Sequence, residues 1–154
     1  MASGNYLIHL YQRCLKMPFG RWLFSTMFAR KAPYFATIKP RIQVLEPNFC
    51  QLTFKKRKAV QNHIGTVHAI AVCNGMEMAM GAVAEASIPK HLRWLPKGMN
   101  VEYLAKTTSD VTIEAKASEQ TWQPGDQLIE VVAHRDDDTV VAKGHITIYV
   151  SNKK

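Results

Sequence analysis

The stretch that decides the fold is residues 62–69, Asn-His-Ile-Gly-Thr-Val-His-Ala, with the helical run that follows it to Val83. Asparagine and glycine give residues 62–65 turn chemistry, and the alanines and methionines that follow favour helix. From Gly65 to Val83 the single formally charged side chain is Glu77. An isolated carboxylate in an apolar segment loses hydration, so Glu77 is a candidate functional group.

The run after the turn predicts one long, buried helix. Gly65 and Thr66 favour a helix start, with Thr66 as the N-cap residue. The segment is apolar nearly all round, which is typical of a helix covered on every side rather than one lying on the surface.

The segments around this helix predict an α+β domain. Two short amphipathic helices are expected at residues 5–17 and 21–30. Alternating apolar and polar residues, separated by turn residues, predict six strands: 37–45, 49–57, 99–106, 110–117, 127–135 and 139–150. We therefore expect a single domain over residues 1–154, with a helical extension at 1–34 and a core at 36–150 in which an antiparallel sheet wraps one helix.

The central turn resembles that of the hotdog-fold thioesterases, and the resemblance covers the core to its last strand. In that superfamily an Asp or Glu follows the turn histidine by nine residues, as Glu77 follows His68 here, and an asparagine precedes it by six, as Asn62 does. The N-terminal helices are similar to those of a poorly characterised bacterial branch. The chain departs from the family at Ala69 and Ile70, where a glycine pair is usual.

The resemblance implies an acyl-CoA thioesterase that hydrolyses an acyl thioester. Glu77 would be the general base or nucleophile, the Ala69 backbone N–H the oxyanion donor, and the Asn62 amide a positioning group. Gly65, His68 and Asn74 would lie on the substrate side. Lys90 and Arg93 could meet the phosphates of coenzyme A.

The spacing of Ala69 and Glu77 has a geometric consequence. Eight residues of helix span about 12 Å, too far for one helix to bring both groups to one carbonyl carbon. Two antiparallel helices can do so, which predicts a composite site in a homodimer, with a tetramer also open. The resemblance implies no cofactor, and His63 and His68 lack the third ligand that a metal site would need. A catalytically weak protein of the same fold that binds an acyl thioester or fatty acyl ligand is the alternative.

The charge is concentrated at the N-terminal end. The chain carries a formal net charge of +8, and no acidic residue precedes Glu46. Such helices could contact an anionic membrane surface, whereas no nucleic-acid-binding motif is present. The same composition resembles a transit peptide, but residues 6–15 form an apolar stripe suited to packing. Three widely spaced cysteines suit a reducing compartment, so a cytoplasmic protein is expected, and no apolar run is long enough to span a membrane.

Overall fold

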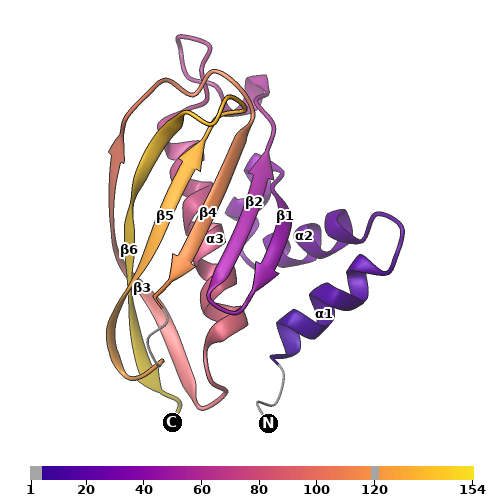
Figure 1. The fold of residues 1–154 in the computed structure, drawn as a ribbon, viewed down its shortest axis with the longest axis vertical. Coiled ribbons are helices and arrows are strands. Elements are labelled where there is room, and N and C mark those ends of the chain that lie inside the picture. The colour runs from indigo at the N-terminus through magenta and orange to yellow at the C-terminus, as the bar shows by residue number, and fades with distance from the viewer. Residues whose placement is uncertain (1–4, 119–121) are drawn as a thin grey trace.

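The computed structural model describes residues 5–118 and 122–154, and its centre is the helix α3 (Ala69–Ser87). Most side chains of α3 are buried, which confirms the expected buried helix. Figure 1 shows α3 lying against one face of the sheet. Gly75 lets the helix approach closely, because a Cβ atom there would come within 2.4 Å of the Ile113 side chain.

In the described part of the chain, six antiparallel strands form one sheet. They are β1 (Arg41–Glu46), β2 (Phe49–Phe54), β3 (Leu92–Tyr103), β4 (Val111–Ala117), β5 (Gly125–His134) and β6 (Val140–Asn152). Their order is β1-β2-β4-β5-β6-β3, so β1 and β3 are the edges. Buried positions alternate along β2, β4 and β5, as expected for strands with one face on a core.

The edge strand β3 contains a bulge. Pro96 pairs with Ile148 and Gly98 pairs with Thr147, so Lys97 is an extra residue in the ladder. Before the bulge Trp94 pairs with the buried Val150, and after it Met99 pairs with Ile146, which places both on the helix side of the sheet.

The N-terminal segment packs onto the β1 side of the sheet as two helices, α1 (Tyr6–Leu15) and α2 (Gly20–Lys31), and a short 3₁₀ helix, η1 (Pro33–Ile38). Tyr11 and Phe24 are buried with their rings edge to face at 4.9 Å, and the Tyr11 hydroxyl donates to the Gln43 carbonyl at 2.6 Å. Tyr11 and Cys14 of the apolar stripe are thus part of the core, whereas Tyr6 and Leu15 at its ends remain exposed.

Three expected boundaries were wrong. The strand expected from residue 37 starts at Arg41, because Pro33 opens η1 and this turn of helix extends to Ile38. The strand expected from residue 99 starts at Leu92, because the bulge hides the alternation of its first half. Helix α3 starts at Ala69 and its N-cap is His68, not Thr66.

The structure contains another short 3₁₀ helix, η2 (Lys58–Val60), just before the central turn. Within the described residues, no helix has both the length and the apolar character needed to cross a membrane.

Candidate functional site

The side chain of Asn62 organises the turn before α3. Its amide oxygen accepts the backbone N–H groups of Ile64 and Thr66 at 3.2 and 3.1 Å, and its amide nitrogen donates to the Thr66 hydroxyl at 2.8 Å. Gly65 has φ +77°, a conformation that glycine adopts without steric cost. Thr66 does not cap the helix, because His68 and not Thr66 immediately precedes the first helical residue, Ala69.

His68 ends this turn and starts the helix. Its backbone N–H donates to the Val60 carbonyl at 2.8 Å, and its ring Nδ1 accepts the backbone N–H of Ile70 at 3.0 Å. Within residues 5–118 and 122–154 the N–H of Ala69 finds no acceptor. A free donor at the positive end of a 19-residue helix is suited to an anionic oxygen.

A cavity of about 350 Å³ lies beside this free N–H. Its walls come from the central turn, from the first turns of α3 and from the segment after β3. The lining residues are Asn62, Ile64, Thr66, Val67, Ala69, Val72, Tyr103, Leu104, Ala105, Lys106, Thr107, Val141 and Ala142. Asn62 and Ala69 thus meet at one cavity, which is mostly apolar and of a size that takes small ligands.

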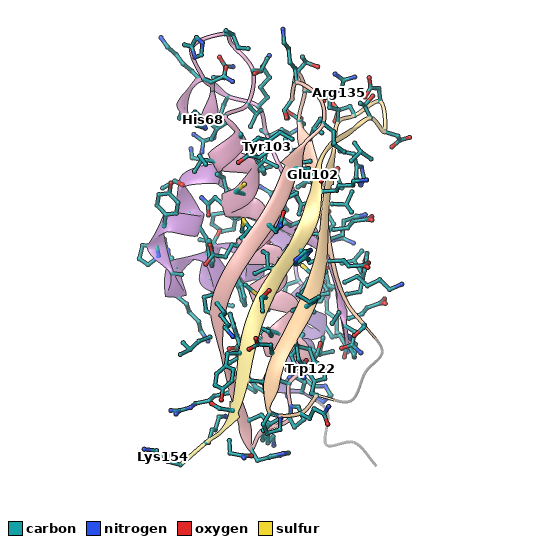
Figure 2. All side chains as sticks on the ribbon, turned by 90° about the vertical axis from the view of Figure 1, so that its left-hand side faces the viewer. His68, Glu102, Tyr103, Trp122, Arg135 and Lys154 are labelled. Carbon is teal, nitrogen blue, oxygen red and sulfur yellow. The ribbon has the colours of Figure 1, made fainter. Side chains whose placement is uncertain are left out.

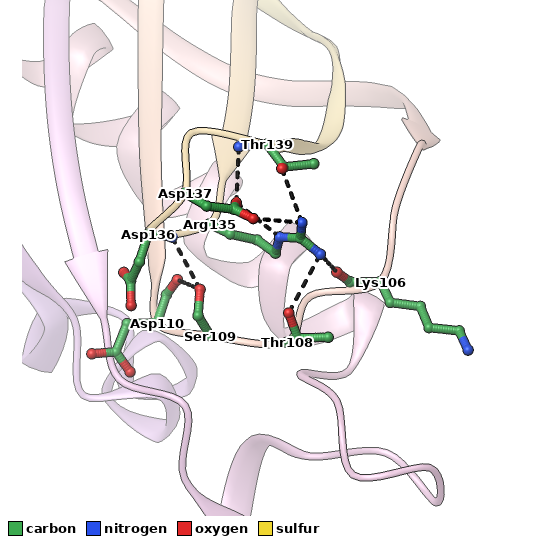
Figure 3. Close-up of polar contacts among 8 residues, drawn as sticks. All are labelled: Lys106, Thr108, Ser109, Asp110, Arg135, Asp136, Asp137 and Thr139. Carbon is green, nitrogen blue, oxygen red and sulfur yellow. Dashed lines mark hydrogen bonds and ion pairs between the residues drawn. The ribbon is translucent and has the colours of Figure 1, made fainter.

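The segment after β3 is held in place from the opposite turn. The guanidinium of Arg135 donates to the Lys106 carbonyl, the Thr108 and Thr139 hydroxyls and the Asp137 carboxylate, as Figure 3 shows. The carbonyl of Thr107 in turn accepts the N–H of Val67 at 2.9 Å. Arg135 is therefore linked through one wall of the cavity to the start of α3, a role that the sequence did not suggest.

Glu77 lies on a stripe of α3 that the sheet leaves partly open. Ala69, Cys73 and Glu77 follow one another at intervals of four residues, and all three are half-buried. At the same spacing the next residue, Gly81, is buried, and Glu85 beyond it is exposed. The Glu77 carboxylate has no hydrogen-bond partner among the described residues and does not line the cavity. Gly81 therefore interrupts the open stripe after Glu77.

Tyr103 connects the end of β3 to α3 at the cavity. It is the last residue of β3, lines the cavity, and its hydroxyl lies 3.6 Å from the Cys73 sulfur. The pKa of Tyr103 is raised, chiefly by this side-chain hydrogen bond. Figure 2 shows Tyr103 and His68 at the same end of the molecule.

Asn74, which was expected on the substrate side, does not line the cavity. It is buried, and its amide donates to the Tyr34 carbonyl and the Thr37 hydroxyl, both at 3.2 Å. Asn74 therefore anchors η1 to α3 and does not reach the cavity.

The comparisons with known proteins give the family. The model of a family described as a domain of unknown function, DUF4442, matches residues 20–150, most of the chain. The chain belongs to the DUF4442 family. No functionally curated protein matches it.

Solved structures give the fold of this DUF4442 protein. A protein described as genomics APC5556 is 45% identical, with a TM-score of 0.84 over 96% of this chain and 99% of that one. A thioesterase family protein from Silicibacter pomeroyi is 19% identical, with a TM-score of 0.73 over 93% and 99%. A probable thioesterase from Pseudomonas aeruginosa is 20% identical, with a TM-score of 0.76 over 89% and 97%. The expected α+β hotdog fold is confirmed.

Two other expected site residues of the DUF4442 protein lie away from the cavity. Lys90 and Arg93 follow the C-terminal end of α3, while Ala69 is at its N-terminal end. Lys90 is exposed, and Arg93 donates to the Ser151 hydroxyl at 3.2 Å. A single chain therefore does not bring these cations to its Ala69.

A larger hollow, about 1080 Å³, lies over β3, β4, β5 and β6 of the DUF4442 protein. Glu102, Lys116, Glu130 and Lys143 line it, and all four are exposed. None of the expected site residues belongs to it. The cavity at the start of α3 is the one that coincides with the expected chemistry.

Proposed function

We propose that this protein hydrolyses an acyl thioester, with acyl-CoA as the substrate class. The observation that carries the proposal is the unpaired N–H of Ala69 at the edge of an apolar cavity. The names of the structural neighbours from Silicibacter pomeroyi and Haemophilus influenzae, which are both described as thioesterases, support it. The fold alone hosts several chemistries, so the argument depends on the site.

The proposed site is composite. The open stripe of α3 runs without interruption from Ala69 to Glu77, about 12 Å along the axis. If two protomers pack with these stripes antiparallel, Glu77 of one lies opposite Ala69 of its partner, and a two-fold axis gives two such sites. The exposed edge of β3, where Met99 and Tyr103 keep 39% and 58% of their surface, supports a contact on this side of the molecule. A tetramer would join two such dimers through other surfaces.

The chemistry follows from the two groups. Glu77 takes a proton from a water molecule as the water oxygen attacks the thioester carbonyl carbon. The N–H of the partner's Ala69 donates to the oxygen that becomes negative in the tetrahedral intermediate. Collapse of that intermediate breaks the carbon–sulfur bond, and the departing thiolate takes from Glu77 the proton that came from water. Asn62 acts mainly by holding the turn, since its amide oxygen is occupied by two backbone donors.

The substrate would lie along the interface between the protomers. The acyl chain fits the cavity, where Tyr103 and Leu104 offer apolar surface. Lys90 and Arg93 are the candidates for the phosphates of coenzyme A, reached from the far end of α3. The thiols of Cys14, Cys50 and Cys73 are free, which fits a reducing compartment such as the cytoplasm.

Binding without turnover is the second candidate function. Ile70 stands where a glycine is usual in the hotdog-fold thioesterases. Its side chain is 52% exposed, next to the residue with the free N–H, Ala69. A branched side chain at this point narrows the approach of a bulky thioester to the backbone. A site narrowed in this way could hold an acyl ligand without bringing its carbonyl to Ala69.

Two substitutions test the enzyme hypothesis with a panel of acyl-CoA substrates. Glu77→Gln removes the base and should lower kcat by about 100-fold or more. Ala69→Pro removes the oxyanion donor at the first helical position, where proline is well tolerated, and should lower kcat by a similar factor. His68, at φ −62° and ψ 135°, already has the extended conformation that precedes proline.

Glu102→Gln is the matched control, because Glu102 is exposed and lies outside the small cavity. It should keep the activity of the wild-type protein. If the wild-type protein binds acyl-CoA but hydrolyses none of the panel, the binding function replaces the enzyme. If Glu77→Gln keeps full activity, the proposed mechanism is wrong.

A further inference from the structure

The turn between α1 and α2 exposes an unusual group of large apolar side chains. Leu15, Met17, Phe19 and Trp22, here called the apolar tip, are exposed by 42%, 52%, 84% and 51%. Single exposed apolar residues are common, but four within eight positions form a patch. Figure 1 shows this turn projecting from the molecule on the side of β1, away from the edge strand β3.

Phe19 combines a strained backbone conformation with an exposed aromatic ring. Its backbone has φ 58° and ψ 21°, a left-handed conformation that a bulky aromatic residue adopts with strain. Its ring is 84% exposed, so no burial offsets that strain. Asparagine or glycine would suit the position better, and a strained, exposed aromatic residue is therefore a sign of function.

The surroundings of the apolar tip are basic. Arg13, Lys16 and Arg21 are all exposed and lie within a few residues of it, and no Asp or Glu precedes Glu46. Among the described residues, the ion pairs involve only Lys55, Lys97 and Arg135 as cations. The positive charge around the tip is therefore not neutralised within the described part of the chain.

We propose that the α1–α2 turn is a docking element for an anionic lipid surface. The apolar tip would enter the boundary between headgroups and acyl chains, while Arg13, Lys16 and Arg21 meet the negative headgroups. A protein partner is less well matched, because a protruding tip offers a small area and no mixed charge. This inference is independent of the proposed hydrolysis, since the tip shares no residue with the cavity.

Co-sedimentation of the full chain with vesicles tests the inference. We expect the wild-type protein to pellet with vesicles of phosphatidylcholine and phosphatidylglycerol, and not with vesicles of phosphatidylcholine alone. Phe19→Asn should weaken binding at least about tenfold through the lost apolar insertion. Lys16→Glu should weaken it at least about fivefold, because each basic residue near an anionic surface contributes about that factor.

The controls separate docking from folding. Phe19→Asn should melt at the temperature of the wild-type protein or above, because asparagine adopts this left-handed conformation with less strain. Tyr149→Thr removes a ring that is 50% exposed on β6 and should leave vesicle binding unchanged. On binding, the emission of the wild-type protein should shift to shorter wavelength, and Trp22→Phe should abolish the shift.

Three results would overturn the inference. The first is that the wild-type protein fails to pellet with anionic vesicles. The second is that Phe19→Asn pellets as well as the wild type. The third is that the wild-type protein binds neutral and anionic vesicles equally. If light scattering instead shows assemblies that Phe19→Asn dissociates, the apolar tip binds a second copy of the chain and not a lipid surface.

Discussion

The ring Nδ1 of His68 accepts the backbone N–H of Ile70 at 3.0 Å, so the residue that precedes α3 is also its cap. The first turn of a helix has four N–H groups without helical acceptors. His68 satisfies the second of them and leaves the first, on Ala69, without an acceptor among the described residues. The cap thus fixes the helix start while the proposed oxyanion donor stays free.

The cap predicts how His68 variants behave. His68→Ala should lower the free energy of unfolding by about 1 kcal/mol, the usual cost of losing an N-cap side chain. His68→Asn should restore most of that stability, because asparagine can accept the same N–H. Urea denaturation of the three proteins measures this, and equal stability of wild type and His68→Ala would show that the ring does not cap the helix.

The composite site predicts that two inactive variants complement each other. A dimer of one Glu77→Gln protomer and one Ala69→Pro protomer has one intact site, built from the Glu77 and the Ala69 that remain. Random mixing should recover about a quarter of wild-type activity from two inactive preparations. The assay is hydrolysis after the mixture has been unfolded and refolded together. Activity that stays at the level of the separate variants would mean that each protomer holds its own complete site.

The position of Cys73 on α3 indicates where the two-fold axis of the proposed dimer passes. Residue 73 lies midway between residues 69 and 77, so in the antiparallel arrangement it faces its own copy. Packed helices lie about 8–10 Å apart, which suits a short bis-maleimide crosslinker better than a disulfide. We expect a covalent dimer from the wild-type protein and none from Cys73→Ser, measured by gel electrophoresis in denaturant.

The other two cysteines provide an internal control for that experiment. Cys14 and Cys50 are buried, and burial raises the pKa of the Cys50 thiol, so neither should react in the folded protein. A crosslinked dimer that persists in Cys73→Ser would contradict the proposed position of the axis.

The Arg135 cluster predicts a pH effect on stability. The hydrogen bond from Arg135 is the main reason that the pKa of the Asp137 carboxyl is lowered. The folded chain therefore holds this proton less tightly than the unfolded chain. The resulting stabilisation is complete above the unfolded pKa of about 3.9 and is lost as the pH falls below it.

Asp137→Asn should accordingly flatten the acid side of the curve of melting temperature against pH. Asp138→Asn is the matched control, because Asp138 is exposed in the same turn and asparagine tolerates its φ of 63°. If both variants keep the wild-type acid dependence, the pair of Arg135 and Asp137 does not contribute to it.

The sequence was sufficient for the features that depend on local pattern. The buried helix followed from an apolar run with one acid, and four of the six strands followed from alternation near the observed bounds. The meeting of Asn62 and Ala69 at one cavity also agrees with the expected turn.

The features that the sequence missed depend on tertiary contacts. Thr66 has good capping chemistry, but the turn continues to His68 before α3 begins. The resemblance implies a place on the substrate side for Asn74, whereas the packing of η1 gives its amide two acceptors away from the cavity. The strained turn at Phe19 has no local signal, since neither a positive φ nor exposure of an aromatic ring follows from residue type.

The bulge in β3 changes which residues of that strand belong to the interior. Every second residue of a strand shares a face, so one inserted residue exchanges the two faces beyond it. Even-numbered Trp94 and odd-numbered Tyr103 therefore lie on the same side, and Tyr103 reaches the cavity because Lys97 stands between them. A strand that kept Lys97 in a regular ladder, without the bulge, would turn Glu102 toward α3 and Tyr103 toward solvent. The bulge therefore sets which residues of the second half of β3 face α3 and line the cavity.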